Sequence, residues 1–276
     1  MPAAASSASS RTISRARRLS VGVALLAAFV ALYAFSNRTA LGQSLENSWA
    51  RLYDVDKTLG HHLDFGGIVP PFTFDIETLV AGVGAAVVIA LVRRRWRAAV
   101  LVAVAMPIVV LGTSLFKQVA GRPELVPSLD TEVSYPSGHA GIALVVTAAL
   151  LIVAPPRLLG WCFAVLGAWC LLVLGGLQAE GQHRASEVIG SSLLTAAVIV
   201  LVDATTRRRG ASLRDTLRST RRPGRAGLAA AAVAAVAIAV IGAWCPVWWP
   251  MPFYAAAALL ATALVCAAAL LARDAG

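Results

Sequence analysis

The sequence has few charged residues, since only 14% of its 276 residues are Asp, Glu, Lys or Arg. A soluble domain typically carries about 25%. Ala, Val and Leu are in excess instead, and they come in long runs close to the roughly 20 residues that a membrane-spanning helix needs. Such runs must form helices or a closed barrel, because lipid offers backbone groups no hydrogen bonds. The runs lack the alternation of barrel strands, so the sequence predicts an all-α, polytopic membrane helix bundle.

Cysteine is also scarce, and the sequence has no internal repeat. The four cysteines lie in or beside apolar runs, without metal-ligand spacing, and we interpret them as packing residues: Cys162, Cys170, Cys245 and Cys266. This pattern favours neither a disulfide framework nor a metal site, and no cofactor is expected. The missing repeat removes the usual signature of a transporter built from inverted halves.

Eight apolar runs predict about eight spans. They cover Leu19–Phe35, Ile76–Val92, Ala98–Phe116, 139–154, 158–177, a run that opens after Arg184 and ends near Ala204, Gly227–Trp244, and Tyr254–Ala272. The first run is longer than a signal-peptide core, which favours a retained signal anchor. The polar segment 36–75 is expected outside, partly as an interfacial helix.

These runs divide the chain into four parts. Residues 1–18 are expected to form a disordered basic tail, residues 19–204 a six-span core, residues 205–226 a basic loop, and residues 227–276 two additional spans. The last two parts are given no role by the sequence.

The net charge of +10 lies mostly at span ends. With the N-terminus in the cytoplasm, 18 of the 24 Lys and Arg residues fall on inside segments, as the positive-inside rule requires. We therefore predict a multi-pass cell-membrane protein with both termini in the cytoplasm. The charge is expected to face membrane lipids and not nucleic acid, and the oligomeric state is open.

Three segments expected on the outer side carry residues that suit phosphate chemistry. Lys117 and Arg122 flank the end of the third run, where a lysine and a planar guanidinium could hold phosphate oxygens. Interfacial snorkelling is the alternative for both residues.

The second segment is Tyr135-Pro-Ser-Gly-His139, directly before an apolar run. A Pro-Gly turn that opens a helix presents free N–H groups to an anion. Ser137 and Gly138 could contribute to that site, with His139 beside it. A capping turn with a passive histidine is the alternative.

The third segment holds His183, Arg184 and Glu187. The histidine and the glutamate are four residues apart and share a helix face. A carboxylate on one ring nitrogen would leave the other free as a base or nucleophile. An ordinary interfacial polar turn is the alternative here. His61 and His62 show no partner spacing and are interpreted as surface residues.

Together, these motifs resemble the signature of the type-2 phosphatidic acid phosphatase superfamily of membrane lipid phosphatases. Its three parts appear in order as Lys117…Arg122-Pro123, Pro136-Ser-Gly-His139 and His183…Glu187. The resemblance covers residues 19–204.

The resemblance implies a metal-independent hydrolase of a lipid phosphate or polyprenyl (di)phosphate, with an extracytoplasmic active site. His183 would be the nucleophile, Glu187 would orient it, and His139 would protonate the leaving oxygen. The phosphate would be held by Lys117, Arg122, Ser137 and Gly138, with Arg184 as a further cation.

The chain departs from the family pattern at four positions, one of which is Glu187 in place of the usual Asp. Glu124 stands where the usual spacing after the lysine places an arginine, and Gly176-Leu177 replaces a Ser-Arg pair upstream of the second histidine. These departures leave open a catalytically impaired member that acts as a lipid-phosphate binder or transporter. A vanadium-dependent haloperoxidase shares the pocket type, but those enzymes are soluble.

Overall fold

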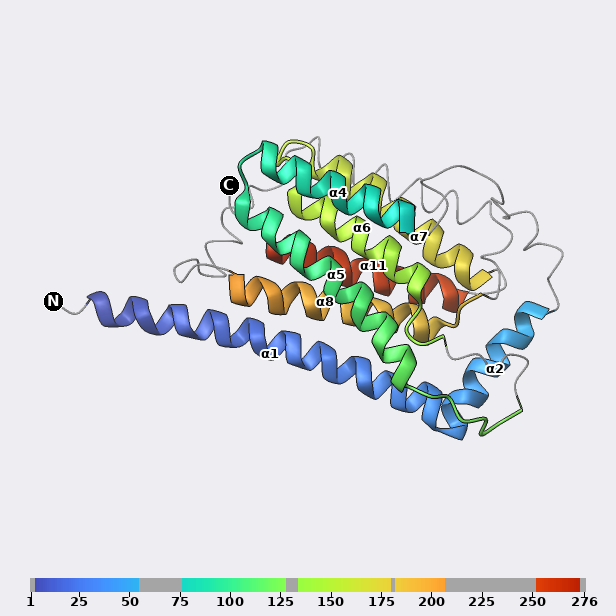
Figure 1. The fold of residues 1–276 in the computed structure, drawn as a ribbon. Helices are drawn as coiled ribbons and strands as arrows, with labels where there is room; N and C mark the ends of the chain where they lie inside the picture. The colour runs from blue at the N-terminus through green and yellow to red at the C-terminus, as the bar shows by residue number, and fades with distance from the viewer. Residues whose placement is uncertain (1–2, 55–75, 128–133, 180–181, 207–251, 274–276) are drawn as a thin grey trace.

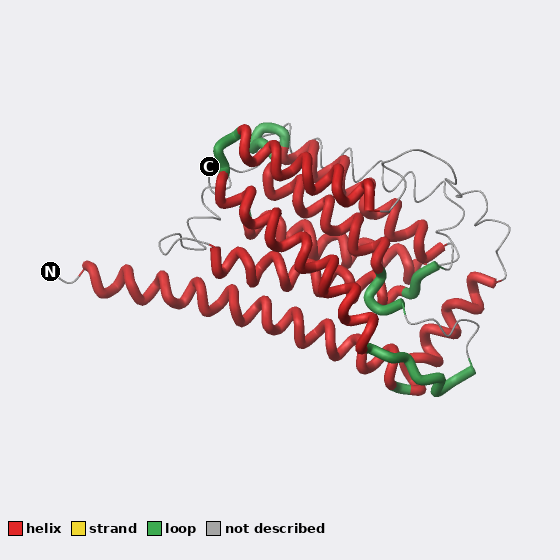
Figure 2. Tube along the Cα trace, viewed as in Figure 1, coloured by secondary structure: helices red, strands yellow, loops and turns green. Residues whose placement is uncertain are grey.

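The computed structural model describes residues 3–54, 76–127, 134–179, 182–206 and 252–273. Within these ranges, the chain forms eight helices and no strand (Figures 1 and 2). The helices are α1 (Ala3–Arg38), α2 (Ala40–Asp54), α4 (Ile76–Val92), α5 (Trp96–Val119), α6 (Gly138–Val153), α7 (Leu159–Ala179), α8 (Ala185–Thr206) and α11 (Pro252–Ala272). The predicted all-α class is confirmed for this part of the chain.

Five of these helices contain stretches that are long and apolar enough to cross a membrane. The stretches are Arg15–Arg38, Trp96–Val119, Leu159–Gln178, Ala185–Thr206 and Tyr254–Ala272. The helices α4 and α6 are apolar but shorter. Together they indicate a membrane protein. The run Gly227–Trp244 and the basic loop from residue 207 onward lie outside the described residues.

Two helices form the centre of the bundle. Helix α8 packs against α1, α5, α6 and α11, and α6 also packs against α4, α5, α7 and α11. Small residues recur on α8, and they let neighbouring helices approach closely. Several of its hydroxyls bond to carbonyls of the same helix, as when Thr195 Oγ1 donates to the Ser191 carbonyl at 2.7 Å. The central position of α8 fixes the side chains of its first turn.

Helix α1 is the longest and begins earlier than the sequence predicts. It starts at Ala3, whereas composition predicts disorder through residue 18, and it extends past the rest of the bundle at its N-terminal end (Figure 1). Ala, Ser and Arg contain no helix breaker, and propagation from an existing helix is easier than nucleation. The apolar span therefore continues as helix into the basic segment.

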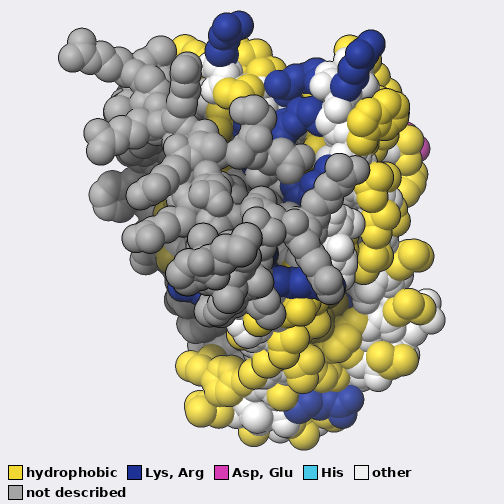
Figure 3. Space-filling model, turned by 90° about the vertical axis from the view of Figure 1, so that its left-hand side faces the viewer, with side chains coloured by type: hydrophobic (Ala, Val, Ile, Leu, Met, Phe, Trp, Pro, Cys, Tyr) yellow, Lys and Arg dark blue, Asp and Glu magenta, His cyan; other side chains and the backbone are white. Residues whose placement is uncertain are grey.

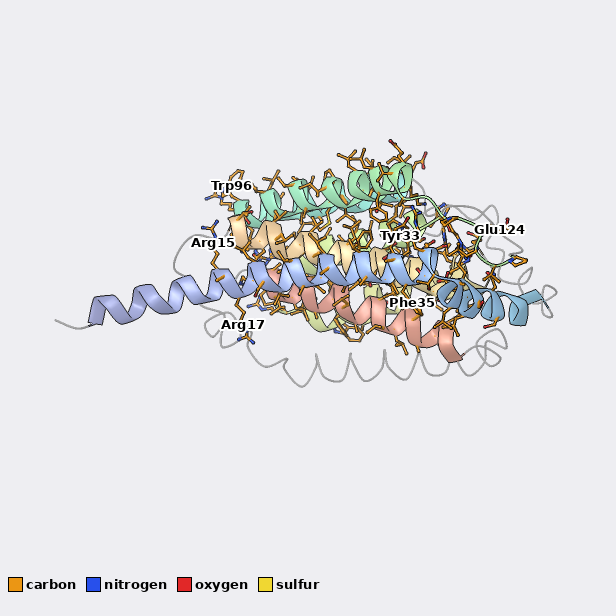
Figure 4. All side chains as sticks on the ribbon, turned by 90° about the horizontal axis from the view of Figure 1, so that it is seen from below. Arg15, Arg17, Tyr33, Phe35, Trp96 and Glu124 are labelled. Atoms are coloured by element: carbon orange, nitrogen blue, oxygen red, sulfur yellow. The ribbon has the colours of Figure 1, made fainter. Side chains whose placement is uncertain are left out.

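The two ends of the bundle differ in charge. Arg15, Arg17 and Trp96 mark one end, which we call the arginine end, and Glu124 lies near the opposite end (Figure 4). Figure 3 looks at the arginine end and shows Lys and Arg side chains spread over it, with hydrophobic side chains along the adjoining flank. The clustering of charge matches the positive-inside pattern in the sequence.

Three arginines cap the C-terminus of α6 at the arginine end. Arg93 Nη1 donates to the Val153 carbonyl at 2.6 Å, and Arg273 donates to the carbonyls of Leu151 at 2.6 Å and Ala154 at 2.9 Å. Arg95 Nη1 lies 3.3 Å from the Ile152 carbonyl. The last carbonyls of a helix have no partner within it and carry partial negative charge, so cations there stabilise it.

Candidate active site

The N-termini of α6 and α8 are joined at the end of the bundle opposite the arginine end. Ser137 is the N-cap of α6, and its hydroxyl accepts a hydrogen bond from the Ala140 N–H at 3.1 Å. Its own N–H donates to the Glu187 carbonyl at 3.2 Å, and its carbonyl accepts from Ser191 Oγ at 2.7 Å. These bonds connect the turn before α6 to the first turns of α8, so His139 is held beside the start of α8.

This junction brings the two predicted catalytic histidines together. His139 Nδ1 lies 3.2 Å from His183 Nε2, and His183 Nδ1 lies 2.9 Å from Glu187 Oε2. We assign the Nδ1 proton of His183 to the bond with the carboxylate, because an ionised carboxylate only accepts. The Nε2 lone pair then points toward His139. His183 and Glu187 are buried, and His139 is exposed.

Glu187 accepts further hydrogen bonds that fix its orientation. The backbone N–H of Arg184 donates to Oε2 and its Nη1 to Oε1, both at 3.2 Å. Ser134 Oγ also donates to Oε1. Several donors favour the charged form of a carboxylate, so Glu187 can stabilise positive charge that develops on His183.

A cavity of about 360 Å³ opens onto the histidine pair. Its lining combines an apolar wall with hydroxyl, ammonium and imidazole groups from Val109, Val110, Thr113, Ser114, Lys117, Gly138, His139, Gly141, Ile142 and His183. A Cβ placed on Gly138 would lie 3.9 Å from Lys117 Nζ, which locates the ammonium beside the start of α6. Lys117, Gly138, His139 and His183 thus share one cavity.

The remaining predicted binding residues lie around this cavity and do not line it. Ser137 is buried, and its hydroxyl is used for capping α6. Arg122 Nη1 lies 3.5 Å from Glu46 Oε2, and Arg184 Nε lies 3.9 Å from the same oxygen. Both guanidinium groups therefore contact a carboxylate from α2.

The positions that depart from the family pattern have different surroundings. Leu177 is buried in the apolar core, and its carbonyl accepts the His183 N–H at 3.1 Å. Glu124 is exposed in the segment after α5 (Figure 4). Neither side chain is part of the cavity lining.

Sequence reasoning missed two residues of this network, Glu46 and Ser134. Ser134 directly precedes the recognised turn, but a lone serine there carries no signal of its own. Glu46 belongs to a polar set with Gln43 and Asn47, whose spacing of three and four residues places them on one face of α2. All three are buried. That spacing was the available signal, although it does not say what the face contacts.

The pKa of Glu46 is raised to about 7, mainly by burial and also by the nearby Glu187, while Ser186, Arg184 and Arg122 act in the opposite direction. Burial is thus the largest influence on this carboxyl group, even though two guanidinium groups lie within 4 Å. Glu46 consequently changes charge in the neutral pH range.

Within the described ranges, no group of three or more His, Cys, Asp or Glu side chains could hold a metal ion. Comparison with protein-family models, curated proteins and solved structures gave no match. The function is therefore inferred from the chemistry of these side chains and from the motif resemblance.

Proposed function

We propose that this chain is an integral-membrane phosphatase that hydrolyses a lipid phosphate or polyprenyl (di)phosphate through a phosphohistidine intermediate. The observation that carries the proposal is the hydrogen-bonded series Glu187–His183–His139, with Lys117 in the same cavity. The resemblance of these motifs to the type-2 phosphatidic acid phosphatase superfamily supports it. The chain would be a divergent member of that superfamily.

In the first step, His183 Nε2 attacks phosphorus and forms the N–P bond while the bond from phosphorus to the leaving oxygen breaks. His139 gives that oxygen its proton, which releases the lipid alcohol or, from a diphosphate, the monophosphate. Glu187 keeps the Nδ1 proton of His183 in place and stabilises the developing positive charge, as the carboxylate does in other histidine-based sites.

In the second step, water attacks the phosphohistidine and the N–P bond breaks. His139, now neutral, accepts a proton from that water, so the cycle returns both histidines to their starting state and releases inorganic phosphate. Phosphoryl transfer needs positioning and cations around a spreading negative charge, and Lys117 is placed to supply one such cation.

The histidine pair must open for this chemistry. A phosphoryl group cannot fit between Nδ1 of His139 and Nε2 of His183 at their separation of 3.2 Å. His139 is exposed on the first turn of α6, so rotation of its side chain can make room without moving the helix. His183 is buried and held by Glu187, which suits a nucleophile that keeps its position.

The position of the site in the bundle suits a lipid substrate. Helix α6 has 16 residues and is therefore about 24 Å long, less than the roughly 30 Å hydrocarbon core of a bilayer. In our proposal the arginine end faces the cytoplasm, and the site end faces outward at headgroup depth. The six apolar helices from α1 to α8, excluding α2, would form the catalytic core. The run Gly227–Trp244 and α11 would add two spans, giving eight.

The test is phosphate release by the purified full-length chain in detergent, with phosphatidate and an isoprenoid diphosphate as substrates and a chelator present. His183→Ala should lower kcat by about 10³-fold or more, because the nucleophile is lost. His62→Ala, a histidine without partner spacing, is the matched control. In acid-quenched reactions, acid-labile phosphate should be bound to the unmodified chain and to His62→Ala, and not to His183→Ala.

Full activity in His183→Ala would contradict the assigned mechanism. A second candidate function, a lipid-phosphate binder or transporter without hydrolysis, is favoured by one observation: Leu177 is a buried core residue where the family has an arginine. Substantial phosphate release by the unmodified chain removes this candidate. Binding of phosphatidate without release would support it.

A further inference from the structure

Helix α2 is fastened to the segment that carries Arg122. Gln43 Nε2 donates to the Pro123 carbonyl at 2.6 Å, and Gln43 Oε1 accepts the Leu125 N–H at 3.0 Å. Asn47 Nδ2 donates to the Pro127 carbonyl at 3.2 Å. These bonds satisfy backbone groups of the loop after α5, so α2 and this loop are held together as one unit.

Glu46 lies between Gln43 and Asn47 on the same face, but it contacts side chains instead of the backbone. One of its oxygens, Oε2, lies within 4 Å of both Arg122 and Arg184. The side chains are only 4% exposed for Glu46, 3% for Arg122 and 11% for Arg184. Two guanidinium groups from distant parts of the chain thus meet one buried carboxylate, beside the cavity that contains the histidines.

We propose that Arg122 and Arg184 form an anion site that Glu46 occupies in the empty protein, and that a phosphate ligand must displace this carboxylate. The inference deepens the proposed function, because it assumes that phosphate binds at this site. A carboxylate and a phosphate present the same kind of oxygens to a guanidinium fork. Glu46 therefore acts as an internal competitor that lowers the affinity for substrate phosphate and for the inorganic phosphate product.

The surroundings of Glu46 make it easy to displace. Because burial raises its pKa to about 7, the carboxylate gains little by staying charged in this position. In addition to Arg122, four groups can influence the charge of Glu46: Arg184, Glu187, Ser186 and Tyr135. A phosphate with two negative charges can therefore displace a carboxylate that has one. When Glu46 binds the two arginines again, it limits the retention of inorganic phosphate, the product.

The experiment measures binding of inorganic phosphate to the purified full-length chain in detergent, by calorimetry and without a hydrolysable substrate. Glu46→Gln keeps the shape of the side chain but removes its charge. At a pH well above 7, where Glu46 is charged, this variant should bind phosphate roughly tenfold more tightly than the unmodified chain, since charged hydrogen-bonded contacts are worth about that factor. Glu46→Asp keeps the charge but withdraws it from the arginines, and should tighten binding by about threefold. Glu77→Gln removes an exposed carboxylate elsewhere and should change nothing.

Unchanged or weaker phosphate binding in Glu46→Gln would overturn the proposal and leave Glu46 as a residue that only holds the arginines in place. If Glu46→Gln does not fold, the test rests on Glu46→Asp. Phosphate binding by Glu46→Asp that is no tighter than that of the unmodified chain would also overturn the proposal. Phosphate binding needs no turnover. A chain that binds phosphate with this pattern but hydrolyses nothing would refute the phosphatase and keep the anion site.

A pH series with sulfate adds a readout that a purely structural role would not change. Sulfate keeps its double charge through the neutral range, and the unmodified chain and Glu46→Gln differ only at residue 46. The ratio of their affinities should therefore report Glu46 alone. It should approach one below its pKa of about 7, where Glu46 is neutral, and rise above it. A ratio that does not change with pH would contradict displacement.

Discussion

Glu187 accepts hydrogen bonds from three different residues, and only the bond to His183 serves the proposed reaction directly. Ser134 and Arg184 supply the others, so the carboxylate is held by groups that do not depend on the histidine. Such support fixes the tautomer and the orientation of the imidazole before a substrate binds.

We predict that Glu187→Gln lowers kcat by about 10³-fold, because a neutral amide no longer stabilises a charged imidazole or enforces its tautomer. KM should change little, since Glu187 lies behind His183 and does not line the cavity. Steady-state kinetics with phosphatidate measure both constants. Glu187→Asp is the control: it keeps the charge and should retain most of the activity. Equal losses in both variants would show that side-chain length matters and charge does not.

At the residue scale, the sequence pointed to Lys117, His139 and His183, which line one cavity. It also pointed to the pair of His183 and Glu187, whose spacing of four residues places both on one helix face. For the turn that holds Ser137, it gave capping only as the alternative, and it did not predict that Arg122 contacts Glu46. Arg122 and Glu46 lie 76 residues apart in the chain. Only the packing of α2 brings them together.

The turn before α6 rests on a contact that a single methyl group would disturb. A Cβ on Gly190 would lie 2.5–2.6 Å from three atoms of Tyr135, and the Tyr135 hydroxyl already donates to the Phe29 carbonyl at 2.7 Å. The ring also packs near Phe29, Tyr33 and Phe116, with centroid distances of 5.2–6.0 Å. The tyrosine therefore has no room to retreat.

Gly190→Ala should accordingly reduce the free energy of unfolding by about 1–3 kcal/mol, the usual cost of overpacking. It should also lower kcat/KM by up to about 10²-fold, since Tyr135 is two residues from Ser137 and a small shift of the turn misplaces His139. Gly176→Ala is the matched control, because nothing lies within 4 Å of a Cβ there. The unfolding temperature in detergent and phosphate release measure the two effects. Equal behaviour of the two variants would contradict this account of the turn.

At the element scale, hydropathy located the helices well. The predicted run Ile76–Val92 coincides with α4, and the other described runs agree with their helices to within a few residues except at the start of α1, because lipid forces an apolar run of this length to be helical. Hydropathy did not predict that α8 lies at the centre or that α1 begins at Ala3. Packing order depends on small residues and helix crossings, and neither changes the hydropathy of a run.

Across the whole molecule, α1 is tied to the bundle near both of its membrane ends. At the site end, Tyr33 Oη donates to the Gly121 carbonyl at 2.6 Å. At the arginine end, Arg18 is ion-paired with Asp203, which also pairs with Arg97. Asp203 is fully buried. One carboxylate thus joins α1, α5 and α8 through two arginines.

Removing one member of this triad should destabilise the protein without damaging the site. Arg18→Ala leaves a buried carboxylate with fewer partners and should lower the free energy of unfolding by about 3 kcal/mol. Arg17→Ala is the control, since Arg17 is adjacent but exposed, and it should change stability by less than about 0.5 kcal/mol. Thermal unfolding in detergent compares the two. Asp203 comes 16 residues after Glu187 on α8, a rise of about 24 Å, so folded Arg18→Ala should keep the kcat of the unmodified chain. A loss of kcat in protein that remains folded would contradict this expectation. It would mean that the contact between α1 and the arginine end of α8 influences the site at the other end of that helix.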